Sequence, residues 1–301
     1  MGRMVKIATA SLLIDDRSKE FGVDIDRAEA LAEAAGEGGA DIVVLPELFD
    51  VYSLGRPEWL KYSGENIPGE GKLQRRFSAA AKKHGMYLVA NILETEGDLL
   101  FNTAILYGRD GAYIGKYRKT HLAPGEEDYI TRGDAYPVFE TDFGKVGITI
   151  CMDIHFPELF RILALQGADI IVHPTMWLDY TGAYCDILAC ARAIDNGVYV
   201  VTSHYVNVPF LAGRAMGHSV IIDPMGRVLA DTGHRPGIAT ATVDLDDVYE
   251  YWAEGGSELK KRYPTLKDCY YQIRRPETYG ILTRPDAENC WKIENPTLYR
   301  P

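Results

Sequence analysis

The sequence contains three side chains whose types match the parts of a covalent acyl-transfer site. Glu47, Lys119 and Cys151 each stand at or near the end of an apolar segment with the pattern of a strand. A carboxylate serves as a base, an ammonium stabilises an oxyanion, and a thiol serves as a nucleophile. Each residue alone is a weak signal, because a glutamate after a strand is usually a solvated loop residue and a lysine in a basic segment usually lies on the surface. In combination, the three supply the parts that acyl transfer needs.

Cys151 stands where a predicted strand, residues 146–150, is followed by a helix that Pro157 can open. At a strand-to-helix turn a side chain is held on a rigid element, and the helix N-terminus supplies N–H donors. Such donors favour the thiolate, so we expect a reactive thiol at this position. The alternative is an inert buried cysteine, which is the more common fate of an unpaired thiol.

The three residues lie in motifs that resemble those of the nitrilase superfamily of carbon-nitrogen hydrolases. The motifs are Leu45-Pro-Glu47-Leu-Phe, Tyr117-Arg-Lys119-Thr-His-Leu and Gly147-Ile-Thr-Ile-Cys151-Met-Asp-Ile-His-Phe-Pro-Glu. Residues 191–200 and 217–229 are similar to scaffold segments of that family. The resemblance extends over about the first 250 residues, and it is specific because several spaced motifs must coincide.

The resemblance implies a role for each matching residue. Glu47 is expected to accept the thiol proton of Cys151 and to protonate the leaving nitrogen. Lys119, together with the backbone N–H of Met152, is expected to stabilise the oxyanion of the tetrahedral intermediate.

A second glutamate of the family's site is expected in the irregular segment 121–134. Long loops in compact domains are often functional, although this one also has the composition of an acidic surface loop. The resemblance favours Glu126, which stands seven residues before Gly133, but Glu127 is adjacent and remains an alternative.

Substrate contacts are predicted from residues that follow the motifs. Trp177 follows a predicted strand in the position of a pocket wall, and Tyr52 stands shortly after Glu47. For the aromatic residues a packing role is an equally good interpretation. The predicted substrate-binding set is Tyr52, Met152, His155, Trp177 and His204.

The residues after the nucleophile indicate the kind of bond that is cleaved. Relatives that hydrolyse nitriles typically have Trp-Glu there, whereas Met152-Asp153 stands here, closer to the pattern of amidases and carbamoyl hydrolases. We therefore expect hydrolysis of the C–N bond of a small linear amide or N-carbamoyl compound through a cysteine thioester, with release of amine or ammonia. Nitrile hydrolysis and transfer of the acyl group to an amine acceptor are the alternatives, and a binding protein with a vestigial site is a third class.

Strand and helix patterns alternate along most of the chain and predict the elements that position these residues. Strands are expected at 6–13, 41–45, 86–93, 101–107, 112–117, 146–150, 168–173, 198–202, 219–222 and 238–243, with the three at 86–117 antiparallel. Helices are expected at 24–35, 71–85, 157–166 and 184–196. The resemblance implies an α/β fold with a four-layer α-β-β-α sandwich, in a hydrolase domain of residues 1–260. Residues 261–301, rich in aromatic residues and poor in regular periods, are expected to form an extended arm that packs on the body or on a neighbouring subunit of a homodimer or higher homo-oligomer.

Composition limits the remaining partners and cofactors. The net charge of -11 and the pI near 5.2 argue against binding to nucleic acid or to an anionic membrane. No apolar stretch approaches the ~18 residues of a membrane span, so a cytoplasmic protein is expected. The five cysteines and seven histidines lack ligand spacing, and we therefore expect no metal and no other cofactor.

Overall fold

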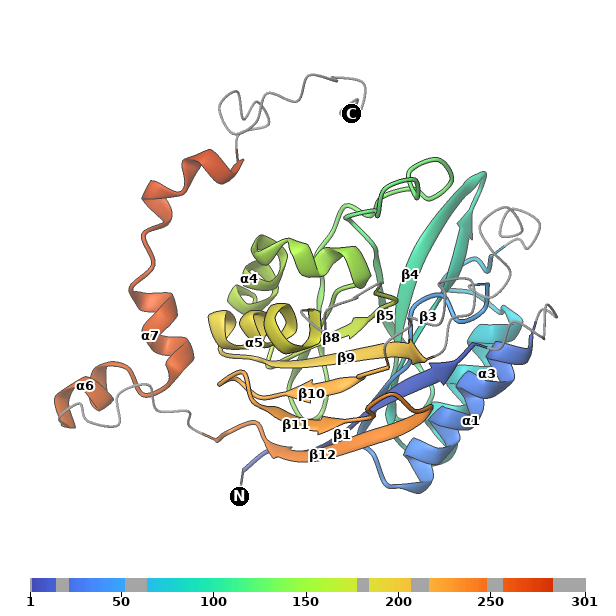
Figure 1. The fold of residues 1–301 in the computed structure, drawn as a ribbon, viewed down its shortest axis with the longest axis horizontal. Helices are drawn as coiled ribbons and strands as arrows, with labels where there is room; N and C mark the ends of the chain where they lie inside the picture. Colours follow the sequence, from blue (N-terminus) through green and yellow to red (C-terminus); the bar gives the residue numbers. More distant parts are fainter. Residues whose placement is uncertain are drawn as a thin grey trace. The chain divides into compact units, whose positions relative to one another are not determined.

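The computed structural model describes residues 2–14, 22–51, 64–177, 184–206, 217–247 and 257–283. The chain divides into two units, Met1–Tyr249 and Glu250–Pro301. The larger unit holds the two sheets and the helices that cover them (Figure 1).

One half of the sheet structure follows the strand order β12-β1-β2-β3-β4-β5. Strands β1, β2 and β3 run parallel, and β3, β4 and β5 form an antiparallel meander, which confirms the prediction for residues 86–117. The strands are β1 (Met4–Leu13), β2 (Ile42–Val44), β3 (Tyr87–Glu96), β4 (Leu99–Tyr107), β5 (Tyr113–Arg118) and β12 (Gly237–Asp244).

The other half follows the order β6-β7-β8-β9-β10-β11, and its β9 pairs with the end of β1. Strands β7, β8 and β9 run parallel. The sequence patterns missed β6 and β11, which are short and carry partly exposed residues. The strands are β6 (Val138–Glu140), β7 (Lys145–Ile148), β8 (Ile170–Pro174), β9 (Tyr199–Val206), β10 (Val220–Ile222) and β11 (Val228–Asp231).

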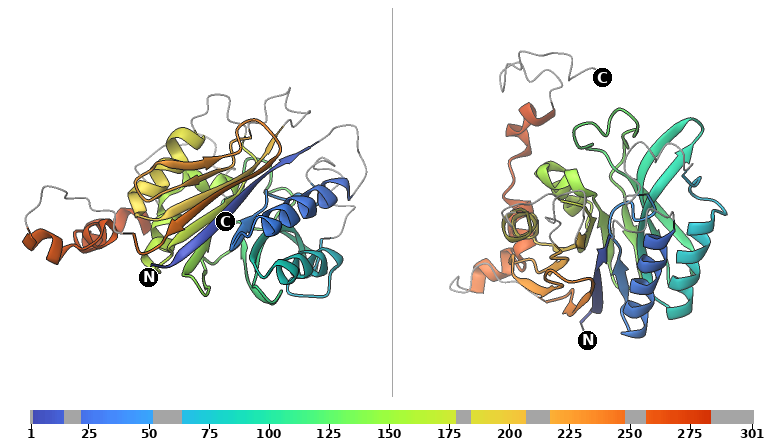
Figure 2. Two further views of the ribbon diagram at one scale, coloured as in Figure 1. Left: turned by 90° about the horizontal axis from the view of Figure 1, so that it is seen from below. Right: turned by 45° about the vertical axis from the view of Figure 1, so that its right-hand side comes forward.

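Helices cover the outer face of each sheet, which confirms the predicted four-layer α-β-β-α sandwich. Figure 2 shows α1 and α3 on one side of the sheets and α4 and α5 on the other. The helices are α1 (Val23–Glu37), α3 (Lys72–His84), α4 (Pro157–Leu165) and α5 (Cys190–Asn196), the last preceded by a π-helical segment, Tyr184–Ala189. Among the described residues, no helix has the length and apolarity that a bilayer span requires.

The alternation of side chains along each strand builds two cores. In β1, Val5 and Ile7 point into the layer between the two sheets, where they meet residues of β7 and β8. Ala8, Ala10 and Leu12 point to the other face and pack against α1 and α3. Both faces of the first sheet are therefore buried, which explains its nearly continuous apolar runs.

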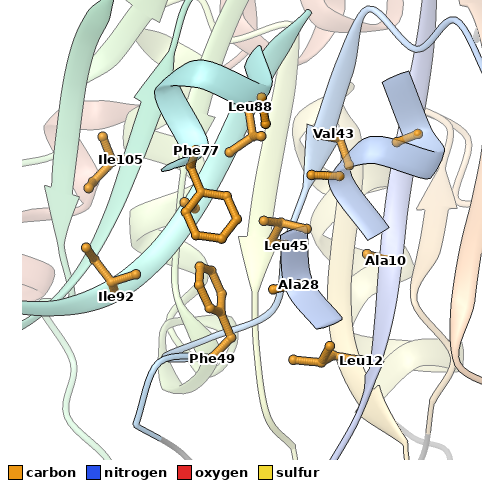
Figure 3. Packing of buried hydrophobic residues seen from close by; sticks show 14 of the residues in the cluster. Ala10, Leu12, Ala28, Val43, Leu45, Phe49, Phe77, Leu88, Ile92 and Ile105 are labelled. Atoms are coloured by element: carbon orange, nitrogen blue, oxygen red, sulfur yellow. The ribbon is translucent and has the colours of Figure 1, made fainter. Parts of the chain in front are cut away.

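The helix-facing core extends to the loop that carries Glu47. Leu45 and Phe49 are both buried in this cluster, one on each side of the glutamate (Figure 3). The ring of Phe49 lies 4.9 Å from that of Phe77 on α3, in a tilted arrangement. Packing on both sides thus fixes the path of the chain through Glu47.

The smaller unit contains more regular structure than the irregular arm expected from the sequence. Its described residues form α6 (Ser257–Arg262), α7 (Leu266–Gln272) and two 3-10 turns, Pro276–Thr278 and Gly280–Thr283. Thr265 and Asp268 form a capping box at the start of α7, a helix signal that hydrophobic periodicity does not reveal. Residues 284–301 of the predicted arm lie outside the described residues.

Candidate active site

The predicted catalytic residues stand just beyond the C-terminal ends of three strands. Glu47 follows β2, Lys119 directly follows β5, and Cys151 follows β7. The strand directions bring Glu47 and Lys119 to one edge, because β5 and β3 are both antiparallel to β4, and β3 is parallel to β2. This edge is where open α/β sheets commonly bind their ligands.

Both carboxylate oxygens of Glu47 are engaged. Oε1 accepts hydrogen bonds from Lys119 Nζ at 2.9 Å and from Asn102 Nδ2 at 2.8 Å. Oε2 accepts the backbone N–H of Met176 at 3.0 Å, and the Tyr205 hydroxyl donates to the carbonyl of Glu47. The side chain of Glu47 is only 2% exposed, so these donors replace the water that a buried carboxylate loses.

The Lys119 ammonium lies between two carboxylates. It is fully buried and lies 2.8 Å from Glu126 Oε2 in addition to its contact with Glu47. The same Glu126 oxygen accepts the backbone N–H of Ala123. Glu127, by contrast, is exposed and accepts the N–H of Gly125 in a surface turn. The structure therefore brings Glu126, not Glu127, to Lys119.

Cys151 occupies a sharp turn after β7. Its φ of 45° lies in the left-handed region, which is uncommon for a residue other than glycine. The half-buried thiol donates to the carbonyl of Met176 at 3.7 Å. Met176 thus contacts the Cys151 thiol through its carbonyl and the Glu47 carboxylate through its N–H. Met152, half-buried, follows within a 3-10 helix, Cys151–His155.

The resting thiol differs from the thiolate that the sequence led us to expect. Burial raises the pKa of the Cys151 thiol, and the Glu47 carboxylate raises it further, whereas Lys119 lowers it only in part. The expectation was wrong because Cys151 opens a 3-10 helix of five residues, separated by Phe156 from α4, and because carboxylates surround the sulfur. Neutral Cys151 is therefore the resting form.

The pKa values of Glu47 and Lys119 are both raised by their surroundings. Burial raises the pKa of Glu47, and Glu126 raises it as well, while Lys119 opposes this rise. Burial disfavours the charged Lys119, yet Glu47 and Glu126 outweigh it and hold the pKa of Lys119 well above its usual value. The lysine is therefore a fixed cation, and Glu47 is a carboxylate of raised basicity next to a thiol.

The predicted substrate-binding residues gather partly around Trp177. This residue is buried, and its backbone N–H donates to His204 Nε2 at 2.8 Å. Its ring meets the ring of Tyr184 edge to face at 5.5 Å, and the ring of exposed His155 meets Tyr184 at 5.1 Å. Trp177 directly follows Met176, which bridges the nucleophile and the base. Tyr52 lies outside the described residues.

Sequence reasoning missed two groups that hold Glu47. Asn102 lies inside β4, where a lone polar residue has no motif to mark it. The Met176 contact uses a backbone N–H, which any residue type supplies. A tertiary contact of either kind leaves no pattern in a single sequence.

Within the described part of the chain, no group of three or more metal-ligating side chains is close enough to hold an ion.

The chain is similar to known proteins in sequence and in fold. A family model described as "Carbon-nitrogen hydrolase" matches residues 7–253. The chain is 36% identical over 258 residues to omega-amidase NIT2 of Xenopus tropicalis, covering 82% of this chain and 91% of that protein. It is 35% identical over 261 residues to a protein of Pyrococcus abyssi named nitrilase, covering 82% and 97% of the two chains.

A similar fold is found in the crystal structure of Nit3 from Saccharomyces cerevisiae, described as a member of branch 10 of the nitrilase superfamily. The TM-score is 0.75 at 28% identity, covering 92% of this chain and 97% of Nit3.

Proposed function

The chain belongs to the carbon-nitrogen hydrolase family, and from this premise we propose that it hydrolyses the terminal amide of a short linear ω-amide through a thioester on Cys151. One observation carries the proposal. Lys119 contacts Glu47 and Glu126, and Met176 hydrogen-bonds to both Glu47 and the Cys151 thiol, so acid, amine and thiol form one connected cluster.

In the proposed first step Glu47 takes the thiol proton of Cys151. The transfer leaves the charge of the site unchanged, because a neutral thiol and a carboxylate become a thiolate and a neutral acid. Lys119 stabilises the new thiolate, as it does the carboxylates in the resting state. The thiolate then attacks the carbonyl carbon of the amide.

The tetrahedral oxyanion is stabilised by Lys119 and the backbone N–H of Met152. Loss of one such donor typically costs roughly 3 to 4 kcal/mol of transition-state stabilisation. Glu47 returns its proton to the leaving nitrogen, ammonia departs, and the acyl group remains on the sulfur. Water activated by Glu47 then hydrolyses the thioester and releases the acid.

Ammonia release from a substrate panel tests the proposal. The panel contains ω-amides of dicarboxylic acids, neutral aliphatic amides, N-carbamoyl amines, N-carbamoyl amino acids and nitriles. We expect the highest kcat/KM with an ω-amide and no ammonia from the Cys151→Ala variant. A faster nitrile or N-carbamoyl compound would overturn the substrate assignment, and a fully active Cys151→Ala variant would overturn the mechanism.

Nitrile hydrolysis is the second candidate, since one of the relatives is named nitrilase. Met152-Asp153 after the nucleophile favours the amide instead. Acyl transfer to an amine is tested in the same assays by adding hydroxylamine, because a transferase then forms the hydroxamate more rapidly than the free acid.

We also propose a cytoplasmic homo-oligomer in which residues 261–301 pack on the body or on a neighbouring subunit. Exposed apolar side chains in the described part of this segment support the idea, among them Ile273, Ile281 and Leu282. Sedimentation of the full chain and of a chain ending at residue 260 tests it. A full-length monomer contradicts the oligomer, and an unchanged mass and melting temperature on truncation contradict the role of the segment. Microscopy of a fluorescently tagged chain tests the compartment.

A further inference from the structure

The two segments that carry the lysine and the nucleophile come from different sheets. Lys119 follows β5 in the first sheet, and Cys151 follows β7 in the second. Attack requires the sulfur and the ammonium to stand at fixed positions around one carbonyl group. Some contact between the two segments must therefore set their relative position.

Asp153 makes this contact. Its carboxylate is fully buried, and Oδ2 accepts the N–H of Ile150 at 2.8 Å and the hydroxyl of Tyr117 at 2.7 Å. Oδ1 accepts the backbone N–H of His121 at 3.1 Å and the Thr120 hydroxyl at 3.3 Å. His121 Nδ1 lies 2.7 Å from Oδ1 and donates to it, because a carboxylate only accepts.

The donors are sequence neighbours of the two catalytic residues. Tyr117 and His121 flank Lys119 along the chain, while Ile150 directly precedes Cys151. The carboxylate thus ties residues 117–121 to the turn 150–153. Among the described residues it makes no hydrogen bond to Glu47, Lys119 or Cys151, so its influence on them is indirect.

Two further observations fit this role. The His121 ring stacks on Phe156 at 3.8 Å, a second contact between residues 117–121 and the chain that follows Cys151. The left-handed φ of Cys151 is a strained conformation that persists only where surrounding contacts hold it. Burial and the charge of Asp153 raise the pKa of Tyr117 well above its usual value, so its phenol keeps the proton that it donates.

We propose that Asp153 is a positioning residue that fixes the Cys151 sulfur relative to Lys119 by joining the lysine segment to the nucleophile turn. The proposal rests on the function proposed above. A misplacement of about 1 Å costs on the order of 100-fold in rate, so even a small relaxation of this contact is measurable.

The test compares Asp153→Asn with Asp223→Asn. Asp223 is also fully buried, and it accepts hydrogen bonds from Met225 and Arg227 within the turn between β10 and β11. Both substitutions remove one buried carboxylate of the same size. The milder Tyr117→Phe variant removes a single donor to Asp153 and serves if Asp153→Asn does not fold.

For Asp153→Asn we expect kcat on the best amide of the panel to fall about 10- to 100-fold, with KM within about threefold of the wild type, because binding is retained and attack geometry is lost. Asp223→Asn is expected to lower the melting temperature by a similar amount but to keep kcat per folded molecule. Equal kcat in the two folded variants overturns the proposal, as does a loss confined to KM.

A thiol readout separates this proposal from the proposed function. The largest contributions to the pKa of the Cys151 thiol come from burial, Glu47, Lys119 and Glu126, so the alkylation of Cys151 by iodoacetamide responds when the sulfur moves among these groups. We expect the pH profile of alkylation to change in Asp153→Asn and to stay unchanged in Asp223→Asn. If the wild type hydrolyses nothing in the panel, the proposed function fails, whereas identical alkylation profiles in both variants reject the positioning role.

Discussion

Lys119 Nζ lies 2.9 Å from Glu47 Oε1, although the two residues are 72 positions apart in the sequence. The pair is almost completely buried, and Glu126 adds a second carboxylate to the same ammonium. With Cys151 protonated, the three charges sum to -1, and proton transfer from the thiol to Glu47 leaves that sum unchanged. The site therefore generates a nucleophile without adding charge to a buried region, a change that otherwise costs several kcal/mol.

Replacing Lys119 by Met should destabilise the protein and abolish turnover. The substitution leaves Glu47 and Glu126 buried without their cation, and breaking a buried pair in this way costs about 3 to 5 kcal/mol. The loss should shrink at low pH, because burial raises the pKa of Glu47 and that carboxylate takes up a proton more readily once Lys119 is gone. Urea unfolding at pH 5 and pH 8 measures it. Lys145→Met is the control, because its solvent-exposed ion pair with Glu140 contributes little to stability. Equal losses in both variants contradict the account.

Glu126→Gln should shift the acidic limb of the kcat/KM profile to lower pH. The Glu126 charge raises the pKa of Glu47, so its removal lets Glu47 lose its proton at a lower pH. Turnover should also fall, because Lys119 loses one of its two anchors. Glu127→Gln, at the exposed neighbouring residue, should leave both the limb and the rate unchanged. A larger effect from Glu127 would reverse the assignment of the second glutamate.

Asp50→Asn should make the free energy of unfolding less dependent on pH. Asp50 is buried and accepts the N–H of Leu93, and burial raises the pKa of its carboxyl to about 7. An unfolded chain loses that proton near ~4. The stability contributed by the protonated form is therefore complete below pH ~4 and is lost as the pH rises toward 7, at up to about 1.4 kcal/mol per pH unit. The variant should show a flatter dependence of unfolding free energy on pH over this range. Parallel curves for the variant and the wild type rule this out.

Features that follow from local sequence patterns were predictable, whereas features that depend on tertiary contacts were not. Glu47, Lys119 and Cys151 stand after apolar runs whose periodicity reveals the strands, and the structure brings Glu47 and Lys119 into direct contact. Asn102 and Met176 were not predictable, because their contacts to Glu47 depend on tertiary neighbours or on the backbone. The left-handed turn at Cys151 and the neutral thiol also depend on surroundings that a single sequence does not give.

The accuracy of the predicted elements likewise follows their length and burial. The strand patterns found the long, buried strands β3 and β4 but not β6, which has three residues, two of them half-buried and one exposed. In the smaller unit, the capping box at Thr265 was the sequence signal for α7, and the aromatic composition obscured it.

The central claim is that an amide carbonyl becomes attached to Cys151. Intact-mass spectra of the enzyme, quenched in acid during turnover of the best amide, test it most directly. The account predicts a mass increase equal to the acyl group of that amide, located by peptide mapping to Cys151, absent in Cys151→Ala and present in Cys269→Ala, which alters a buried cysteine of the other unit. Undiminished hydrolysis by Cys151→Ala, with no adduct on the wild type, would contradict it.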